Sequence, residues 1–141
     1  MKYVIDSSVA VKWELSETDS DKSDSLRNDF RNGVHEFLSL DIFMVEAAHA
    51  LTRAERQRRI LVGQARKLFL DILTTPPLFF PFHPLMLRAI DISSKMRIGV
   101  YDCCYVALAE REQCEFITAD TTLVKNLQST FPSILSLASM P

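Results

Sequence analysis

Four acidic residues in this sequence could bring carboxylates together for catalysis: Asp6, Glu46, Asp102 and Asp120. No group of cysteines or histidines with zinc-type spacing accompanies them, so their oxygen donors suit a hard cation such as Mg2+ or Mn2+. Carboxylates that share a small pocket raise one another's pKa, and a divalent ion removes that penalty. Such an ion also polarises a phosphoryl oxygen and activates a bound water, which is what phosphodiester hydrolysis requires.

Each acid taken singly also has a structural explanation. A lone aspartate at the end of a strand or loop commonly caps a helix, and this applies to the three aspartates. Glu46 lies within the apolar run 42–48, where a carboxylate loses hydration unless a donor or a cation meets it. Helical spacing places Glu46 on one face with Arg53, so an ion pair with Arg53 is the alternative to a metal ion.

Two of the acids follow predicted strands. Residues 3–5 form a short apolar run that is typical of a buried strand and ends at Asp6, and residues 115–118 are predicted to form another strand, ending at Asp120. In open parallel sheets, ligands bind outside the carboxyl ends of the strands, at a topological switch point. We therefore expect Asp6 and Asp120 to lie near each other.

The rest of the chain alternates between strand-like and helix-like patterns. Further strands are predicted at 37–40, 78–82 and 134–137, and further helices at 42–59, 64–73, 85–96 and 103–112, with short helices after Asp6 and Asp120. Ser7 and Ser8 are predicted to cap the first helix and Asp41 the helix that carries Glu46, while residues 16–24 are predicted to form a loop that enters another helix. The alternation predicts one α/β domain over residues 1–141 with a mostly parallel sheet.

Length and composition are those of an ordinary globular domain. The chain has 141 residues, of which 48% are hydrophobic and 24% charged, and it contains no apolar run of the roughly 20 residues that a membrane span needs. An acid at position 6 is too early for a signal peptide, which predicts a cytoplasmic protein. Cys103, Cys104 and Cys114 lack metal-type spacing and are expected to be buried, reduced thiols.

A net charge of -2 argues against nucleic-acid binding by bulk charge alone. The one dense basic stretch is Arg53, Arg56, Arg58, Arg59, Arg66 and Lys67. It is either a solvated helix surface or a place of contact with phosphate or a partner, for which Arg53 and Arg56 are the candidates. His49 lies one turn from Glu46 and is expected to be a packed or partly exposed helix residue, while Trp13 and Phe43 are expected in the core.

Four motifs, in order along nearly the whole chain, resemble those of the PIN-domain nucleases and in particular the VapC-type toxins of bacterial toxin–antitoxin pairs. The segments that carry the likeness are residues 4–9 (VIDSSV), 46–51 (EAAHAL), 101–109 (YDCCYVALA) and 117–120 (ITAD). One such motif would be weak evidence, but four in the expected order are strong.

The resemblance implies a three-layer α/β/α sandwich and cleavage of single-stranded or looped RNA with Mg2+ or Mn2+. It implies that Asp6 and Asp102 are the principal metal ligands, with Glu46 and Asp120 as supporting ligands or holders of metal-bound water. Ser7 or Ser8 and Thr118 match hydroxyl positions that orient a carboxylate or water. A homodimer is also implied, as is inhibition by a small antitoxin whose C-terminal segment occludes the site.

Two other functions remain to be weighed against an RNA endonuclease. A catalytically silent PIN-like module that binds RNA or protein would share the fold, and loss of Mg2+ binding would support it. A receiver-like regulatory domain also carries acids at strand ends, but it expects adjacent acids after the first strand, whereas Ser7 and Ser8 follow Asp6 here. That alternative also gives Glu46 no role.

Overall fold

A five-stranded, fully parallel sheet forms the centre of the computed structural model, which describes residues 1–141. The strands are β1 (Lys2–Ile5), β2 (Glu36–Leu40), β3 (Leu78–Phe80), β4 (Glu115–Thr118) and β5 (Ile134–Ser136), in the spatial order β3-β2-β1-β4-β5. β1 pairs with both β2 and β4, in the registers Val4 with Leu38 and Val4 with Phe116. All four pairings are parallel.

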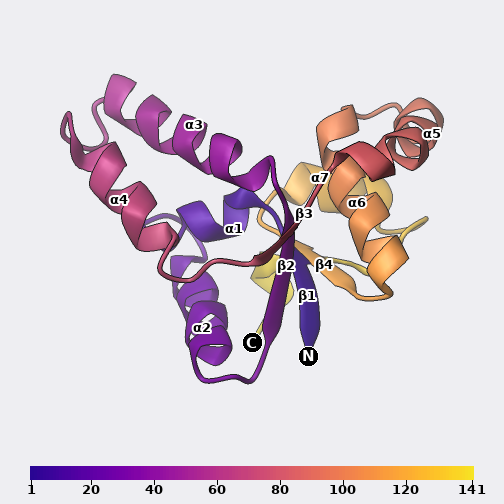
Figure 1. The fold of residues 1–141 in the computed structure, drawn as a ribbon, viewed down its shortest axis with the longest axis horizontal. Coiled ribbons are helices and arrows are strands. Elements are labelled where there is room, and N and C mark those ends of the chain that lie inside the picture. Colours follow the sequence, from indigo (N-terminus) through magenta and orange to yellow (C-terminus); the bar gives the residue numbers. More distant parts are fainter.

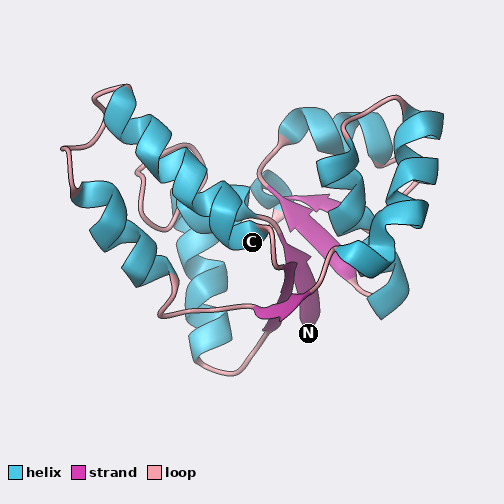
Figure 2. Ribbon diagram, turned by 45° about the horizontal axis from the view of Figure 1, so that its top comes forward, coloured by secondary structure: helices cyan, strands magenta, loops and turns pink.

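Helices cover both faces of this sheet, which makes a three-layer sandwich (Figures 1 and 2). One layer holds α1 (Ser7–Val11), α2 (Ser20–Arg31), α3 (Phe43–Arg56) and α4 (Gln64–Ile72). The other holds α5 (Met86–Met96), α6 (Val100–Glu112) and α7 (Thr121–Leu127). Short 3-10 helices occupy His83–Leu85 and Leu137–Ser139.

Alternating side chains of the strands divide the core in two. Val4 and Phe116 point into the cluster under α5, α6 and α7, whereas Ile5 and Ile117 point into the cluster under α1 to α4. This is the period of two that a pleated strand imposes. All four side chains are fully buried, as expected for a parallel sheet covered on both faces.

The chain reverses its direction across the sheet between β1 and β4. It winds from β1 out to β2 and β3, then crosses back to β4 and β5, so β1 and β4 are neighbours at the switch point. The loops after these strands lead to α1 and α7, and they begin at Asp6 and Ala119. Ligand sites in such sheets form at this switch point, so a functional site is expected at the carboxyl ends of β1 and β4.

Most of the predicted elements are present, with shifted ends. β4 has the predicted bounds, and the sheet is wholly rather than mostly parallel. β3 is an edge strand, as the proline at 81 suggested. The loop predicted at 16–24 is wrong over its second half, because α2 begins at Ser20. There, Ser20 uses its side chain to bond the backbone of Leu15 and Glu17 and so anchors the helix start.

The predicted caps are wrong at three helix starts. Asp6, not Ser7 or Ser8, caps α1 by accepting a hydrogen bond from the backbone of Ser8. Asp41 caps nothing, because its carboxylate accepts from the Phe82 amide at 3.1 Å and so ties the end of β3 to the start of α3. Asp102 lies inside the first turn of α6, which starts at Val100 after Gly99.

Other side-chain expectations are met. Trp13 and Phe43 are core residues. Cys103 and Cys104 are buried free thiols, while Cys114 is only partly buried. None of the helices has the length and apolarity needed to traverse a bilayer.

Candidate active site

Asp6 is the buried centre of the candidate site. Its side chain lies at the carboxyl end of β1, and the residue is 7% exposed. One carboxylate oxygen, Oδ1, accepts from the Ser8 amide at 3.1 Å and from the Ser8 hydroxyl. The other, Oδ2, accepts from the Thr118 hydroxyl at 2.6 Å. Burial raises the pKa of Asp6 to about 7 despite these hydrogen bonds, which act in the opposite direction.

The hydroxyls of Ser8 and Thr118 connect the two sides of the switch point. They lie 3.3 Å from each other, and the Ser8 oxygen accepts from the Ala119 amide at 3.0 Å. The Thr118 oxygen accepts from the Asp120 amide at 3.2 Å. Ser7 makes no side-chain hydrogen bond, so of the two candidate serines it is Ser8 that orients Asp6. The network holds the loops after β1 and β4 in one fixed arrangement.

Glu46 reaches the site from the first turn of α3, where it is half-buried. Its carboxylate accepts a hydrogen bond of 2.5 Å from the Tyr105 hydroxyl, which comes from α6 on the opposite side of the sheet. The predicted alternative, an ion pair with Arg53, does not form, because Arg53 lies instead 3.5 Å from the His49 ring. Burial raises the pKa of Glu46, and the Tyr105 hydroxyl partly offsets that rise.

Asp102 and Asp120 complete the acidic set from two further elements. Asp102 projects from the first turn of α6, is half-buried and accepts no hydrogen bond. Asp120 is exposed at the N-terminus of α7, where its carboxylate caps the helix by accepting from the Leu123 amide at 3.1 Å. For Asp120 the capping explanation from sequence is therefore correct, and one of its two oxygens is free of that role.

The four acids influence one another electrostatically. After burial, the charges of Glu46 and Asp102 raise the pKa of Asp6 further. Asp102 also raises the pKa of Glu46, and Asp120 raises that of Asp102. The placement of the acids agrees with this coupling. Asp6 and Asp120 follow the neighbouring strands β1 and β4 and share Thr118 as a hydrogen-bond partner, and Glu46 is bonded to the helix that carries Asp102. All four predicted acids therefore lie at one edge of the sheet.

The donor set fits a hard divalent cation by its chemistry, since it offers only carboxylate and hydroxyl oxygens. The mutual rise in pKa is also what a bound cation would reverse. No three of these side chains converge with the spacing of a preformed metal site. The four acids thus match a divalent cation in donor type and in charge, but their side chains are not arranged in a preformed coordination geometry.

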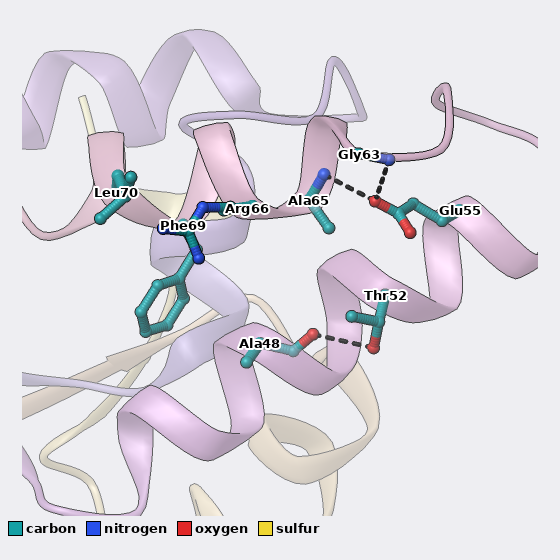
Figure 3. Close-up of a pocket in the computed structure, with 8 residues that line it drawn as sticks. All are labelled: Ala48, Thr52, Glu55, Gly63, Ala65, Arg66, Phe69 and Leu70. Atoms are coloured by element: carbon teal, nitrogen blue, oxygen red, sulfur yellow. Dashed lines mark hydrogen bonds between the residues drawn. The ribbon is translucent and has the colours of Figure 1, made fainter.

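The largest cavity in the molecule lies away from the acids. It measures about 480 Å³, lies between α3 and α4, and includes none of the four carboxylates in its lining. Glu55 borders it and accepts hydrogen bonds from the amides of Gly63 and Ala65, at 3.0 and 2.8 Å (Figure 3). These bonds satisfy free amides at the start of α4, so the cavity is explained by helix pairing rather than by catalysis.

The predicted contacts with RNA or a partner lie on α3. Arg53 and Arg56 are both exposed, in the last turn of the helix whose first turn carries Glu46. Neither forms a salt bridge within the chain. A smaller cavity of about 350 Å³ is lined by Glu46 and His49, so this histidine does lie at the edge of the acidic site.

Tyr105 is the residue of the site that sequence reasoning missed. It is 1% exposed, stacks on Phe116 with ring centroids 5.7 Å apart, and directs its hydroxyl at Glu46. A signal was present, since Tyr105 follows Asp102 by three residues and so shares its helix face. A buried tyrosine hydroxyl also needs a partner, and on that face the acids were the available ones.

Comparisons with known proteins agree with this geometry. The family model of the PIN domain matches residues 3–126. Among solved structures, PAE2754 from Pyrobaculum aerophilum superposes with a TM-score of 0.74 at 15% identity, over 99% of this chain and 85% of that one. A chain in the structure of VapBC2 from Rickettsia felis bound to a DNA fragment from their promoter superposes with a TM-score of 0.63 at 14% identity, over 96% and 97% of the two chains. The search of curated proteins gave no match.

Proposed function

Because the chain belongs to the PIN domain family, whose members are generally nucleases that use divalent metals, we propose that it is a Mg2+- or Mn2+-dependent endoribonuclease. We further propose that residues 1–141 form one nuclease domain acting as the toxin of a type II toxin–antitoxin pair in the cytoplasm. The observation that carries the proposal is the gathering of Asp6, Glu46, Asp102 and Asp120 at the switch point of the sheet.

Some residues of the site would bind the metal ion, and others orient the carboxylates that bind it. Asp6 and Asp102 would be the principal ligands of Mg2+ or Mn2+, with Glu46 and Asp120 as supporting ligands or holders of water. When bound, the ion would supply Lewis-acid activation of the phosphate and of the attacking water. Ser8 and Thr118 fix the Asp6 carboxylate from both sides, and Tyr105 fixes Glu46.

Several features support RNA and a protein inhibitor as partners. Exposed Arg53 and Arg56 can neutralise phosphates of an RNA that runs along α3 from the acidic edge, which a chain of net charge -2 cannot do through bulk charge. The structural likeness to a chain of the VapBC2 assembly supports a cognate antitoxin as a partner, and the family resemblance implies that this antitoxin would occlude the site. A homodimer belongs to the same proposal, as the resemblance implied.

The test is cleavage of a mixed pool of structured RNAs by the purified, antitoxin-free protein. Mg2+ or Mn2+ is compared with excess EDTA, and the wild type is compared with Asp6→Asn and with Asp91→Asn, an exposed aspartate on α5, as the matched control. We expect metal-dependent cleavage by the wild type and by the control, and a loss of at least 100-fold in Asp6→Asn, as for removal of one catalytic metal ligand.

The opposite result would favour the catalytically silent module. If the folded wild type neither cleaves any RNA of the pool nor binds Mn2+ in calorimetry of the same samples, the acidic edge is not a metal site. RNA binding that persists under those conditions would then identify the chain as an RNA-binding module of PIN fold.

A further inference from the structure

An apolar cavity borders the candidate active site and has no role in the proposal so far. It measures about 290 Å³, and every residue that lines it is hydrophobic. We call it the base cavity, and it is lined by Ile42, Phe82, Met86, Val100, Tyr101 and Cys104. Two of these residues carry large aromatic side chains that lie outside the core, since Tyr101 is 66% and Phe82 is 37% exposed.

The base cavity lies at the same edge of the sheet as the acids. Ile42 follows β2 and Phe82 follows β3, both at the carboxyl ends of their strands. Tyr101 immediately precedes Asp102 in α6, and it also lines the neighbouring cavity together with Glu46 and His49. One exposed aromatic ring therefore separates the acidic site from an apolar hollow.

We propose that the base cavity receives one unpaired nucleobase of the RNA substrate, with Tyr101 as the stacking residue that determines specificity for single strands. The inference rests on the proposed function and deepens it. Unpaired bases are commonly bound by stacking on exposed aromatic side chains, and duplex bases are not available for this. A nucleotide whose phosphate lies at the acids would have its base within reach of the adjoining Tyr101 ring.

The chemistry of the lining favours a base over other occupants. A cavity of about 290 Å³ lies just below the roughly 300–1,000 Å³ typical of small-ligand pockets, so it suits one planar group rather than a larger ligand. Its neighbours Glu46 and Asp102 are acidic, which disfavours an anionic group inside it. The Tyr101 hydroxyl is the one strong hydrogen-bonding group among the side chains that line it, because the weak Cys104 thiol donor is directed at the Met86 sulfur at 3.8 Å. The site would therefore select for a stacked base with little preference among the four bases.

The test is a double-mutant cycle between the protein and the RNA. In an RNA that the wild type cleaves, each nucleotide around the cleaved bond is replaced in turn by an abasic one, and kcat/KM is measured for the wild type and for Tyr101→Ala. Loss of one stacked base costs roughly 5- to 150-fold. We expect such a loss at one position in the wild type, the same loss from Tyr101→Ala on intact RNA, and no further loss when both changes are combined.

Two other variants define the role of the ring. Tyr101→Phe keeps the aromatic face and should restore most of the kcat/KM that Tyr101→Ala loses. Leu87→Ala, a change at a residue 80% exposed on α5 that lines neither cavity, is the control and should leave the abasic profile unchanged. Binding of a labelled single-stranded RNA in EDTA, followed by anisotropy, provides a readout without cleavage, and Tyr101→Ala should weaken it by a similar factor.

The outcomes separate this inference from the proposed function. If the wild type cleaves RNA but Tyr101→Ala and the abasic substitutions reduce kcat/KM independently, the base cavity does not hold a base and a protein partner becomes its better occupant. If the wild type neither cleaves nor binds RNA, the proposed function fails and this inference fails with it.

Discussion

At the scale of single residues, the Asp6 carboxylate has opposite effects on stability and on function, because the ionised form that would bind a metal ion is the form that burial destabilises. Its carboxylate is buried, and burial raises its pKa from the ordinary 3.8 to about 7. A group whose pKa is higher in the folded state stabilises the fold fully below its unfolded pKa, and that stabilisation is lost as pH rises through the folded pKa. The metal-free protein therefore loses stability between about pH 4 and pH 7 on account of Asp6.

Asp6→Asn removes this titration. We expect the variant, in EDTA at pH 8, to exceed the wild type in free energy of unfolding by about 1 to 3 kcal/mol, with a smaller gain at pH 5. Urea unfolding at the two pH values measures both quantities. An equal effect of the substitution at pH 5 and pH 8 would show that the Asp6 carboxylate does not titrate with a raised pKa.

Tyr105→Phe isolates a single hydroxyl group. The ring would still stack on Phe116, but Glu46 would lose its hydrogen-bond donor. Because that hydrogen bond lowers the pKa of Glu46, the glutamate should become harder to ionise and less well oriented. We expect the Mn2+ concentration for half-maximal RNA cleavage to rise about 10- to 100-fold, with little change in thermal stability. Cleavage with an unchanged Mn2+ requirement would show that Tyr105 only packs.

At the scale of elements, the strands and most helices follow from periodicity, whereas their capping does not. β1 and β4 each contain a short run of strand-favouring apolar residues with no competing pattern, so the sequence located them closely. Helix caps depend on which polar group the folded chain brings near a free amide. Asp41, for example, bonds to Phe82, which lies 41 positions away in sequence. Nothing local could reveal that contact.

The same reasoning explains how much of the site could be predicted. The acids were recognised because their residue type and their positions beside strand ends carry the signal. The Tyr105 contact with Glu46 was not, because it joins α6 to α3 across 59 positions. The choice of Ser8 over Ser7 likewise depends on the Thr118 hydroxyl and the Ala119 amide, which only the folded sheet brings close.

The pairing of α3 with α4 depends on Glu55, which provides the prediction at this scale. Glu55→Ala leaves two amides at the start of α4 without their acceptor and should lower the free energy of unfolding by about 1 kcal/mol. Urea unfolding measures the loss, and hydrogen exchange should accelerate at Gly63 and Ala65. Glu112→Ala, whose side chain contacts only the neighbouring Arg111, is the control and should change stability by less. Equal losses in the two variants would argue against the cap.

At the scale of the whole molecule, an ionic cluster connects α2, α4 and the segment after α1, and within it the side chains of Arg27 and Glu14 are buried whereas that of Asp71 is exposed. Arg27 of α2 contacts Asp71 of α4 at 3.2 Å and stacks over Trp13 at 4.6 Å. Glu14, just after α1, lies 3.9 Å from the same guanidinium, and its Oε1 is buried without a hydrogen bond. Burial and the nearby Asp71 raise the pKa of Glu14 to about 8.

This cluster predicts a second pH dependence of stability, independent of the acidic site. Since the folded pKa of Glu14 is raised from 4.5, its contribution is full below about pH 4.5 and lost as pH rises through 8. Glu14→Gln should therefore flatten the decline and stabilise the protein by about 1 to 3 kcal/mol at pH 9. Thermal or urea unfolding from pH 5 to pH 9 measures the slope, and an unchanged slope would rule out Glu14 as its source.

The proposed function depends above all on whether the four acids at the switch point bind a divalent cation. Calorimetric titration with Mn2+ tests it most directly, on the wild type, on Asp102→Asn and on the Asp91→Asn control. We predict saturable binding in the wild type and the control and its loss in Asp102→Asn, since Asp102 accepts no hydrogen bond within the chain and would be free to ligate. Absence of Mn2+ binding in the folded wild type, or equal binding in all three proteins, would contradict it.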